Sequence, residues 1–246
     1  MIEDLDELMR REGVDAILAE GNAFEVPDVY WLTGFRSPDP IICYHAAGEE
    51  TVVATAFNTL ERIKRESFVK RTYDLTGIYT ELMQQGKTAS DNPDRTYGSL
   101  LKSLFTGRVI GVPDHLPASV VIALQRMGYE IKVVPRLFRE ARARKSPREL
   151  AAIEKAGECT VAAVQRVIEM VKDSEIGPNG TLMYRGETLR VGHLKMALEH
   201  FLLDRGAESV EDAIMAVGER GFDWHYLGMY EDPLRAEVPI IVDVFP

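Results

Sequence analysis

The sequence is poor in cysteine and has no long apolar run, and both absences narrow the kind of protein it can encode. Its two cysteines, Cys43 and Cys159, stand far apart, in a strand-like and a helix-like segment, and form neither a disulfide framework nor a metal-binding knuckle. No stretch approaches the roughly 20 apolar residues that span a bilayer. The acidic residues 1–13 lack the basic and apolar regions of a signal peptide. We therefore expect a protein of the reducing cytoplasm that has no membrane partner.

An excess of basic residues is also missing. Lysine and arginine together number 29, against 39 aspartate and glutamate residues, and the formal net charge is −10. A nucleic-acid-binding protein would present a basic face, so nucleic acid is not an expected partner. The sequence also lacks the G-x-G-x-x-G spacing of dinucleotide-binding loops and the G-x-S-x-G motif of serine hydrolases. Nothing marks either cysteine as an activated nucleophile.

The first part of the chain alternates between strand and helix patterns. Apolar residues recur at helical spacing in residues 2–12, and residues 97–104 also favour a helix. Residues 108–134 are typical of a βαβ unit, with a proline at the start of the helix and Gly128 after it, which predicts two parallel strands joined by a right-handed crossover. Further strands are predicted at residues 15–19, 29–35, 41–45, 51–55 and 71–75. This alternation predicts an α/β domain.

The pattern changes near residues 139–148, which hold four arginines and one lysine. We interpret this segment as a solvated linker or helix surface and place a domain boundary near residues 140–146. Ser146, Pro147 and Glu149 predict the start of a long helix. Its apolar stripe is expected at Leu150, Ile153, Ala156, Val161, Val164, Ile168 and Val171. A helix at residues 191–203 and strands at 213–217 and 239–244 are predicted to follow.

Two residues are candidates for chemistry. His225 lies in the glycine-containing segment 218–228, which follows a predicted strand, although an ordinary hairpin with a surface histidine would look the same. Asp243 ends an apolar strand whose alternation places it on one face with Ile241; it is either a strand-end surface residue or a ligand. Hard oxygen ligands suit Mn, Mg or Zn, but a single carboxylate is not a metal site. His193 and His200 are seven residues apart on one helix, and we expect surface or packing roles for both.

Taken in order along the chain, several segments resemble the prolidase and aminopeptidase P branch of the pita-bread metallopeptidases. Residues 30–35 (YWLTGF) resemble the Y-L-T-G-F signature of the N-terminal domain of that family. Residues 144–156 resemble the entry into its catalytic domain. Residues 218–226 are similar to the loop that ends in H-Y, and residues 232–243 are similar to the approach to the D-x-G metal-ligand strand.

The resemblance implies a fold and an activity. It implies a creatinase-like α/β domain, with a mixed sheet and flanking helices, over residues 1–140, and the first part of an α+β pita-bread domain over residues 141–246. It implies hydrolysis of the bond before proline by two divalent ions, Mn, Co or Zn, held by two Asp, one His and two Glu, with a metal-bound water as nucleophile. Asp243 matches the first Asp ligand, and His225 matches a histidine that contacts substrate. A homodimer and proline-containing peptides are the implied partners.

The resemblance also leaves questions open. The family's second Asp, its ligand His and both Glu have no counterpart in residues 1–246, so we expect an N-terminal portion of a longer protein that is inactive by itself and does not bind both metals fully. Residues 244–245 replace the usual residues after the first Asp, Trp224 precedes the histidine, and residues 177–192 look like an insertion. A non-catalytic binding or dimerisation protein, or a creatinase-type hydrolase on the same fold, are the alternatives.

Overall fold

The computed structural model describes residues 3–246, which divide into two compact units, one up to Lys145 and the other from Ser146 to Pro246. Each unit is described by itself. The N-terminal unit is built on a six-stranded sheet with the strand order β4-β3-β2-β1-β5-β6. The strands are β1 (Ala16–Gly21), β2 (Ile41–Ala46), β3 (Val52–Thr55), β4 (Arg71–Asp74), β5 (Val109–Val112) and β6 (Glu130–Val133).

The sheet of the N-terminal unit is mixed. Strand β1 pairs antiparallel with β2 and parallel with β5, β2 pairs antiparallel with β3, and the pairs β3–β4 and β5–β6 are parallel. The predicted strands β2 and β3 form an antiparallel hairpin, and the predicted parallel pair β5–β6 is confirmed. A mixed sheet with flanking helices is the fold class that the sequence predicts for this part of the chain.

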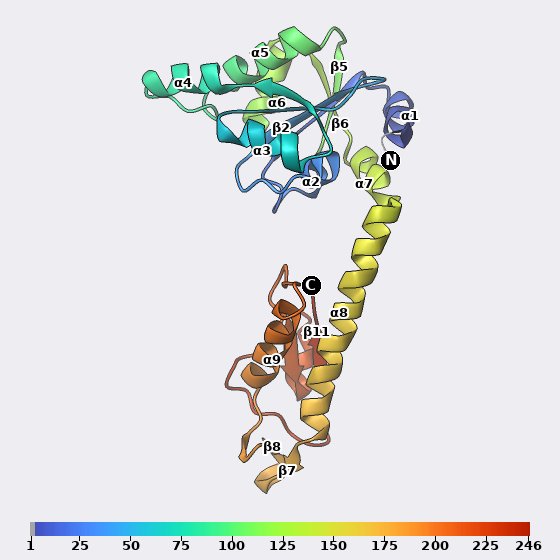
Figure 1. The fold of residues 1–246 in the computed structure, drawn as a ribbon, viewed down its shortest axis with the longest axis vertical. Helices are drawn as coiled ribbons and strands as arrows, with labels where there is room; N and C mark the ends of the chain where they lie inside the picture. Colours follow the sequence, from blue (N-terminus) through green and yellow to red (C-terminus); the bar gives the residue numbers. More distant parts are fainter. Residues whose placement is uncertain (1–2) are drawn as a thin grey trace. The chain divides into compact units, whose positions relative to one another are not determined.

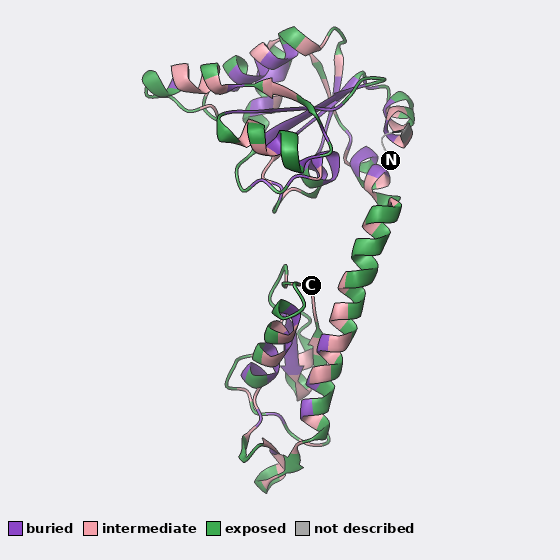
Figure 2. Cartoon of the chain, viewed as in Figure 1, coloured by how far each residue is buried: buried purple, intermediate pink, exposed green. Residues whose placement is uncertain are grey.

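Helices cover both faces of this sheet (Figure 1). They are α1 (Glu3–Glu12), α2 (Pro27–Thr33), α3 (Asn58–Glu66), α4 (Thr76–Gln84), α5 (Pro93–Leu104), α6 (Ala118–Arg126) and α7 (Pro135–Ala143). One apolar cluster joins Ile17 and Cys43 to side chains of α1, α2, α3 and α7. The other joins Leu18 and Tyr44 to α5 and α6, with α4 at its margin. Successive residues of β1 and β2 therefore serve two cores, which explains why both strands are buried along most of their length (Figure 2).

The predicted strand at residues 29–35 is wrong, because this segment forms helix α2. Its aromatic and β-branched residues favour a strand by propensity, but the flanking residues favour a helix. Pro27 occupies the first helical turn, Asp28 is an acid in that turn, and Gly34 closes the helix in the left-handed conformation with φ 60°. These end signals, together with packing of Val29 and Leu32 into the core, outweigh the strand propensity.

The C-terminal unit packs two helices against small sheets. Helix α8 (Pro147–Lys172) lies beside α9 (Val191–Leu203), and β10 (Ile214–Val217) pairs with β11 (Ile240–Asp243) (Figure 1). The predicted helix at residues 191–203 and the two predicted strands are confirmed. The stretch 177–192, expected as an inserted link, takes part in a three-stranded sheet of β7 (Glu175–Ile176), β8 (Leu182–Tyr184) and β9 (Glu187–Thr188).

Helix α8 begins as predicted but buries a different face. Ser146 Oγ accepts a hydrogen bond from the Glu149 backbone N–H, and Glu149 Oε2 accepts one from the Ser146 backbone N–H, a reciprocal cap. The buried positions are Ala163, Val167 and Met170, in the half of the helix that meets α9. Leu150 and Ile153 of the predicted stripe are exposed (Figure 2). No helix within residues 3–246, α8 included, combines the length and apolar composition that crossing a membrane requires.

Candidate functional site

The candidate residue Asp243 ends strand β11 on the exposed side of the β10–β11 sheet. The register pairs Asp243 with Ile214 and Ile241 with Ala216. Met215 of β10 and Val242 of β11 point to the opposite side, where they pack in the core of the C-terminal unit. The alternation predicted from the sequence is therefore observed: Ile241 and Asp243 are exposed, and Ile240 and Val242 are more buried. Strand β11 therefore places the Asp243 carboxylate on the face of the sheet that is turned away from the core.

The segment between β10 and β11 folds back over this same face. It starts with a short 3-10 helix, η2 (Gly218–Phe222), and a Cβ atom added at Gly221 would lie 2.9 Å from Ile241 Cγ1. Farther along, Gly228 has φ 85°, and a Cβ there would lie 2.1 Å from the carbonyl oxygen of Met215. Only glycine permits so close an approach to the strand backbone. The Met215 N–H also donates to the Leu227 carbonyl at 3.1 Å, so the loop is fastened along β10.

A polar network braces the loop from within. Tyr226 OH donates to Asp232 Oδ2 at 2.7 Å and accepts a hydrogen bond from Arg220 Nη1 at 2.6 Å, and Arg220 also pairs with Asp232 Oδ1. The Met229 backbone N–H donates to Asp232 Oδ2 at 3.1 Å. Burial by itself would raise the pKa of Asp232, but the hydrogen bonds from Tyr226, Arg220 and Met229 outweigh burial and hold the pKa below its ordinary value. The ionised Asp232 carboxylate thus holds Arg220, Tyr226 and Met229 of this loop in place.

His225 stands directly before the braced Tyr226 and is itself exposed. Its backbone N–H donates to Asp223 Oδ1 at 3.0 Å, which fixes the chain at this point. The neighbouring aromatic side chains of Phe222 and Trp224 are 84% and 83% exposed. The loop therefore presents an imidazole and two unburied rings on a backbone that the Arg220–Tyr226–Asp232 network holds, an arrangement suited to contacting a ligand.

A buried lysine on α9 supports the far end of the loop. Lys195 is 2% exposed; its Nζ lies 3.2 Å from Asp212 Oδ2 and 5.8 Å from the centre of the Tyr230 ring. Gly192, one turn earlier, leaves room for Tyr230, because a Cβ there would lie 2.7 Å from the ring. Sequence analysis missed this residue. The available signal was a charged residue on the apolar stripe of α9, between Leu194 and Leu198.

The residues present do not by themselves build a metal centre. Nowhere in residues 3–246 do three or more His, Cys, Asp or Glu side chains gather as they would to hold a metal ion. Asp243 is one carboxylate, and one oxygen ligand does not define the six- or four-fold coordination of the divalent ions in question. The side chains of residues 3–246 therefore do not by themselves provide the ligands of a two-metal centre.

The remaining sequence candidates lie outside this region. Burial raises the pKa of the Cys43 thiol far above its ordinary value, so it is no nucleophile. His193 Nδ1 accepts a hydrogen bond from the Arg190 backbone N–H at 3.3 Å at the start of α9, and His200 is exposed near its end. The seven-residue spacing therefore does not bring these two histidines into one site.

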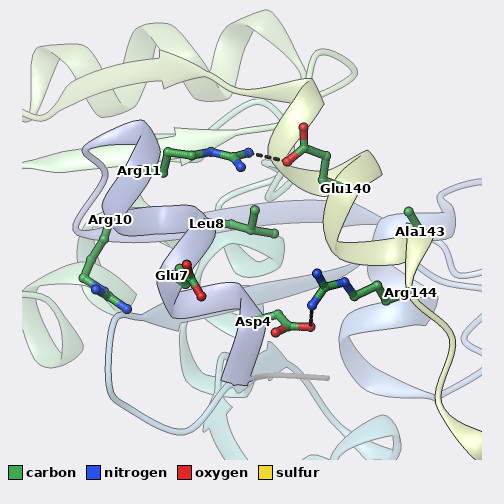
Figure 3. Close-up of a pocket in the computed structure, with 8 residues that line it drawn as sticks. All are labelled: Asp4, Glu7, Leu8, Arg10, Arg11, Glu140, Ala143 and Arg144. Carbon is green, nitrogen blue, oxygen red and sulfur yellow. Dashed lines mark hydrogen bonds and ion pairs between the residues drawn. The ribbon is translucent and has the colours of Figure 1, made fainter.

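A cavity of about 630 Å³ in the N-terminal unit lies between α1 and α7. Figure 3 shows that four of its charged side chains pair across it: Arg11 with Glu140, and Arg144 with Asp4, whose Nη1–Oδ2 distance is 3.1 Å. The groove is a contact between two helices that these exposed pairs bridge, and we assign it no function.

Comparison with known proteins places the fold. No family profile matches the chain, and no curated protein matches its sequence. Solved structures do match over 99% of the chain. The prolidase from Pyrococcus furiosus has 17% identity, a TM-score of 0.71 and 65% of its own length covered. For the Xaa-Pro dipeptidase from Bacillus anthracis the identity is 17%, the TM-score 0.75 and the covered share of its own length 59%. For the X-Pro aminopeptidase from Thermotoga maritima the identity is 15%, the TM-score 0.68 and the covered share 60%.

These matches show that the chain has a prolidase and aminopeptidase P-like fold, as the sequence motifs predict. The expected architecture, a mixed α/β sheet domain followed by part of a pita-bread domain, is confirmed at the level of the fold. The chain spans 59% to 65% of the length of the structures named above. At such low identity the likeness concerns the fold alone.

Proposed function

We propose that the whole protein is a metal-dependent Xaa-Pro peptidase, a dipeptidase or an aminopeptidase that hydrolyses the peptide bond before proline. The observation that carries this proposal is the fold likeness along 99% of the chain to structures described as prolidase, Xaa-Pro dipeptidase and X-Pro aminopeptidase. The β10–β11 sheet supports it, because it presents a carboxylate and a loop histidine on surfaces free of the core.

The proposal gives two residues a role. Asp243 is one ligand of a centre that binds two divalent ions, Mn, Co or Zn, whose other ligands lie outside residues 1–246. His225 contacts the substrate from the braced loop. In this proposal residues 1–140 form the creatinase-like domain and residues 141–246 the N-terminal part of the pita-bread domain, and these 246 residues by themselves do not hydrolyse substrate.

The proposal extends to partners. A proline-containing peptide is the substrate, a second copy of the protein forms a homodimer with the first, and the cytoplasm is the compartment. The two free cysteines agree with a reducing compartment, because neither lies in a disulfide. Size-exclusion chromatography with light scattering tests the dimer directly: a monomer at micromolar concentration contradicts it.

The test is hydrolysis by the product of the complete reading frame, supplied with Mn, Co or Zn. We expect cleavage of Xaa-Pro dipeptides or of peptides with proline in the second position, and no cleavage of matched peptides with alanine in place of proline. Asp243→Asn is expected to reduce kcat by at least about 100-fold, as loss of a metal ligand does. Glu219→Gln, an exposed carboxylate in the segment between β10 and β11, is the matched control and keeps activity.

Three outcomes would count against the proposal. Hydrolysis of creatine with no activity on Xaa-Pro peptides would assign the creatinase-type alternative. Absence of any hydrolysis by a folded, metal-supplied product would favour the non-catalytic binding protein. Full activity of Asp243→Asn would remove this residue from the centre even if the peptidase activity itself were observed.

A further inference from the structure

The second half of the loop between β10 and β11, residues 228–236, is anchored to the core of the C-terminal unit. The Val191 N–H at the start of α9 donates to the Asp232 carbonyl oxygen at 2.9 Å. The Leu234 N–H donates to the Leu189 carbonyl oxygen at 2.9 Å, and the Leu234 side chain is fully buried in the same core as Leu189. The backbone position of Asp232 is therefore set by contacts that do not involve the first half of the loop.

The first half of the loop, residues 218–227, lies at the surface. Each of its residues is exposed or half-buried, and His225 is among the exposed ones. The His225 N–H donates to Asp223 Oδ1 at 3.0 Å, and the Tyr226 N–H donates to the Asp223 carbonyl oxygen at 3.2 Å. These two bonds form a tight turn, which fixes the local shape of the chain around His225. Where this turn lies relative to the sheet depends on contacts outside it.

Three side chains connect the two halves of the loop. Tyr226 OH donates to Asp232 Oδ2 at 2.7 Å. Arg220 Nη1 donates to Tyr226 OH at 2.6 Å, the guanidinium lies 5.4 Å from the centre of the Tyr226 ring, and it also pairs with Asp232. The Asp232 side chain is 14% exposed, so these charge-assisted hydrogen bonds are partly shielded from solvent. Because Tyr226 directly follows His225, the anchored Asp232 constrains where the backbone of His225 lies.

We propose that Tyr226, Asp232 and Arg220 are positioning residues, which hold the imidazole of His225 in the orientation that contacts a peptide substrate. The inference rests on the proposed function, because the contact between His225 and substrate belongs to that proposal. A displacement of about 1 Å in a group that must meet the substrate can cost about 100-fold in rate. A histidine on an exposed loop therefore needs supporting contacts of this kind in order to act in a fixed place.

A purely structural role for these three side chains makes a different prediction. Their contacts lie within the loop, whereas the core of the unit is formed by apolar side chains of α8, α9 and the strands. Removing the Tyr226 hydroxyl leaves that core in place, so we expect little change in the melting temperature. A positioning role predicts a loss of activity that exceeds the loss of stability and that depends on the presence of His225.

The first experiment is a double-mutant cycle on the metal-supplied product of the complete reading frame, with an Xaa-Pro substrate that the parent protein cleaves. Tyr226→Phe keeps the ring and removes the hydroxyl that binds Asp232. It is expected to lower kcat/KM about tenfold, and Asp232→Asn is expected to lower it at least as much. In a His225→Ala background the same substitutions are expected to change kcat/KM by less than about twofold, because the residue that they position is already gone.

The second experiment measures backbone hydrogen exchange in the same proteins and does not depend on activity. Tyr226→Phe is expected to speed exchange at least about tenfold within residues 218–228 and to leave the amides of α8 and α9 unchanged. The reason is that the hydroxyl connects the surface half of the loop to Asp232, whereas both helices are held by the core.

Two control variants separate positioning from stability. Asp204→Asn, at an exposed aspartate that ends α9, makes the same chemical change as Asp232→Asn and is expected to leave kcat/KM and the exchange of the loop unchanged. Val167→Ala opens a cavity in the core between α8 and α9, where Val167 is 2% exposed. It is expected to lower the melting temperature while the folded protein keeps its kcat/KM.

The inference is overturned if the parent protein hydrolyses Xaa-Pro substrates while Tyr226→Phe and Asp232→Asn keep its kcat/KM, or if their effects are undiminished in the His225→Ala background. Exchange within residues 218–228 that Tyr226→Phe does not change also overturns it. Absence of hydrolysis by the folded, metal-supplied parent protein contradicts the proposed function, and with it the role of His225, so the two failures are distinguishable.

Discussion

The N-terminal and C-terminal units bury their sheets in different ways. In the N-terminal unit the six-stranded sheet has apolar clusters on both faces, and Leu18 and Ile17, adjacent in β1, serve one cluster each. In the C-terminal unit the β10–β11 sheet turns only one face to the core, and the loop between its strands carries Phe222 and Trp224 almost fully exposed. The comparison indicates that the first unit is organised around stability, whereas the second keeps polar and aromatic side chains available.

Individual carboxylates of the two units differ in what burial does to them. In the N-terminal unit, burial raises the pKa of Glu20 and of Asp28, so the ionised forms of these two side chains are a cost to folding, whereas backbone hydrogen bonds lower the pKa of Asp15 in the same unit. In the C-terminal unit, hydrogen bonds lower the pKa of Asp232, so its ionised form stabilises the loop. The N-terminal unit thus tolerates two carboxylates whose ionised forms are unfavourable, whereas the loop of the C-terminal unit is stabilised by an ionised carboxylate.

The largest expected effect is in the two-sided core. Leu18→Ala removes a side chain with no exposed surface from β1, and a cavity of this kind costs about 3 kcal/mol of the free energy of unfolding. Val133→Ala, at a 58% exposed edge position on β6, is the control and is expected to cost less than about 0.5 kcal/mol. Hydrogen exchange resolved along the chain measures both. The difference between the two units would be contradicted if Leu18→Ala lowered the free energy of unfolding by less than about 1 kcal/mol, or if residues 146–246 lost as much exchange protection as the N-terminal unit.

The next effect tests the C-terminal unit through its buried lysine. Asp212→Ala leaves Lys195 buried without its carboxylate, and because the Asp212 side chain is 56% exposed we expect a loss of about 1–2 kcal/mol, below that of a fully buried pair. Lys195→Met in the same place removes the charge and keeps the volume, so it is expected to be close to neutral. Urea unfolding monitored in the C-terminal unit distinguishes the two. Equal destabilisation by both variants would show that Lys195 acts through packing, not through its charge.

The smallest effect is a pH dependence in the N-terminal unit. The folded pKa of Glu20 lies above its ordinary value of about 4.3. The contribution of this group to stability is therefore full below the ordinary value and is lost as pH rises through the folded pKa. Glu20→Gln should consequently be more stable than the parent at pH 7, with the difference shrinking toward about pH 4. Thermal unfolding of both proteins across this range measures it; a difference that grows on acidification would have the wrong sign.

The six strands of the N-terminal unit could be predicted from the sequence where local signals agree with one another, whereas helices α3, α4 and α7 were not predicted. The β5–α6–β6 segment has short apolar strands, a proline at the helix start and Gly128 after the helix, and each of these acts within a few residues. Helix α2 could not be predicted, because its interior favours a strand while only its end residues Pro27, Asp28 and Gly34 favour a helix. Packing between α1, α2 and the sheet decides that this segment is a helix, and local sequence propensities carry no information about that packing.

The candidate site was less accessible to sequence reasoning. Alternation along β11 is local, so the outward position of Asp243 could be predicted. The Arg220–Tyr226–Asp232 network could not, because it joins residues up to 12 apart through the path of an irregular loop. Gly228 is the residue that fixes this path, and its need for glycine appears only once Met215 is seen beside it. The roles of His225 and Asp243 in chemistry stay predictions.

The measurement that tests the account most directly is the metal content of the purified product of the complete reading frame, determined by mass spectrometry alongside its Asp243→Asn variant. We predict about two divalent ions per chain in the parent protein and a clear deficit in the variant, at unchanged helix and sheet content. A folded parent protein that binds no divalent ion, or a variant that binds as much metal as the parent, would contradict it.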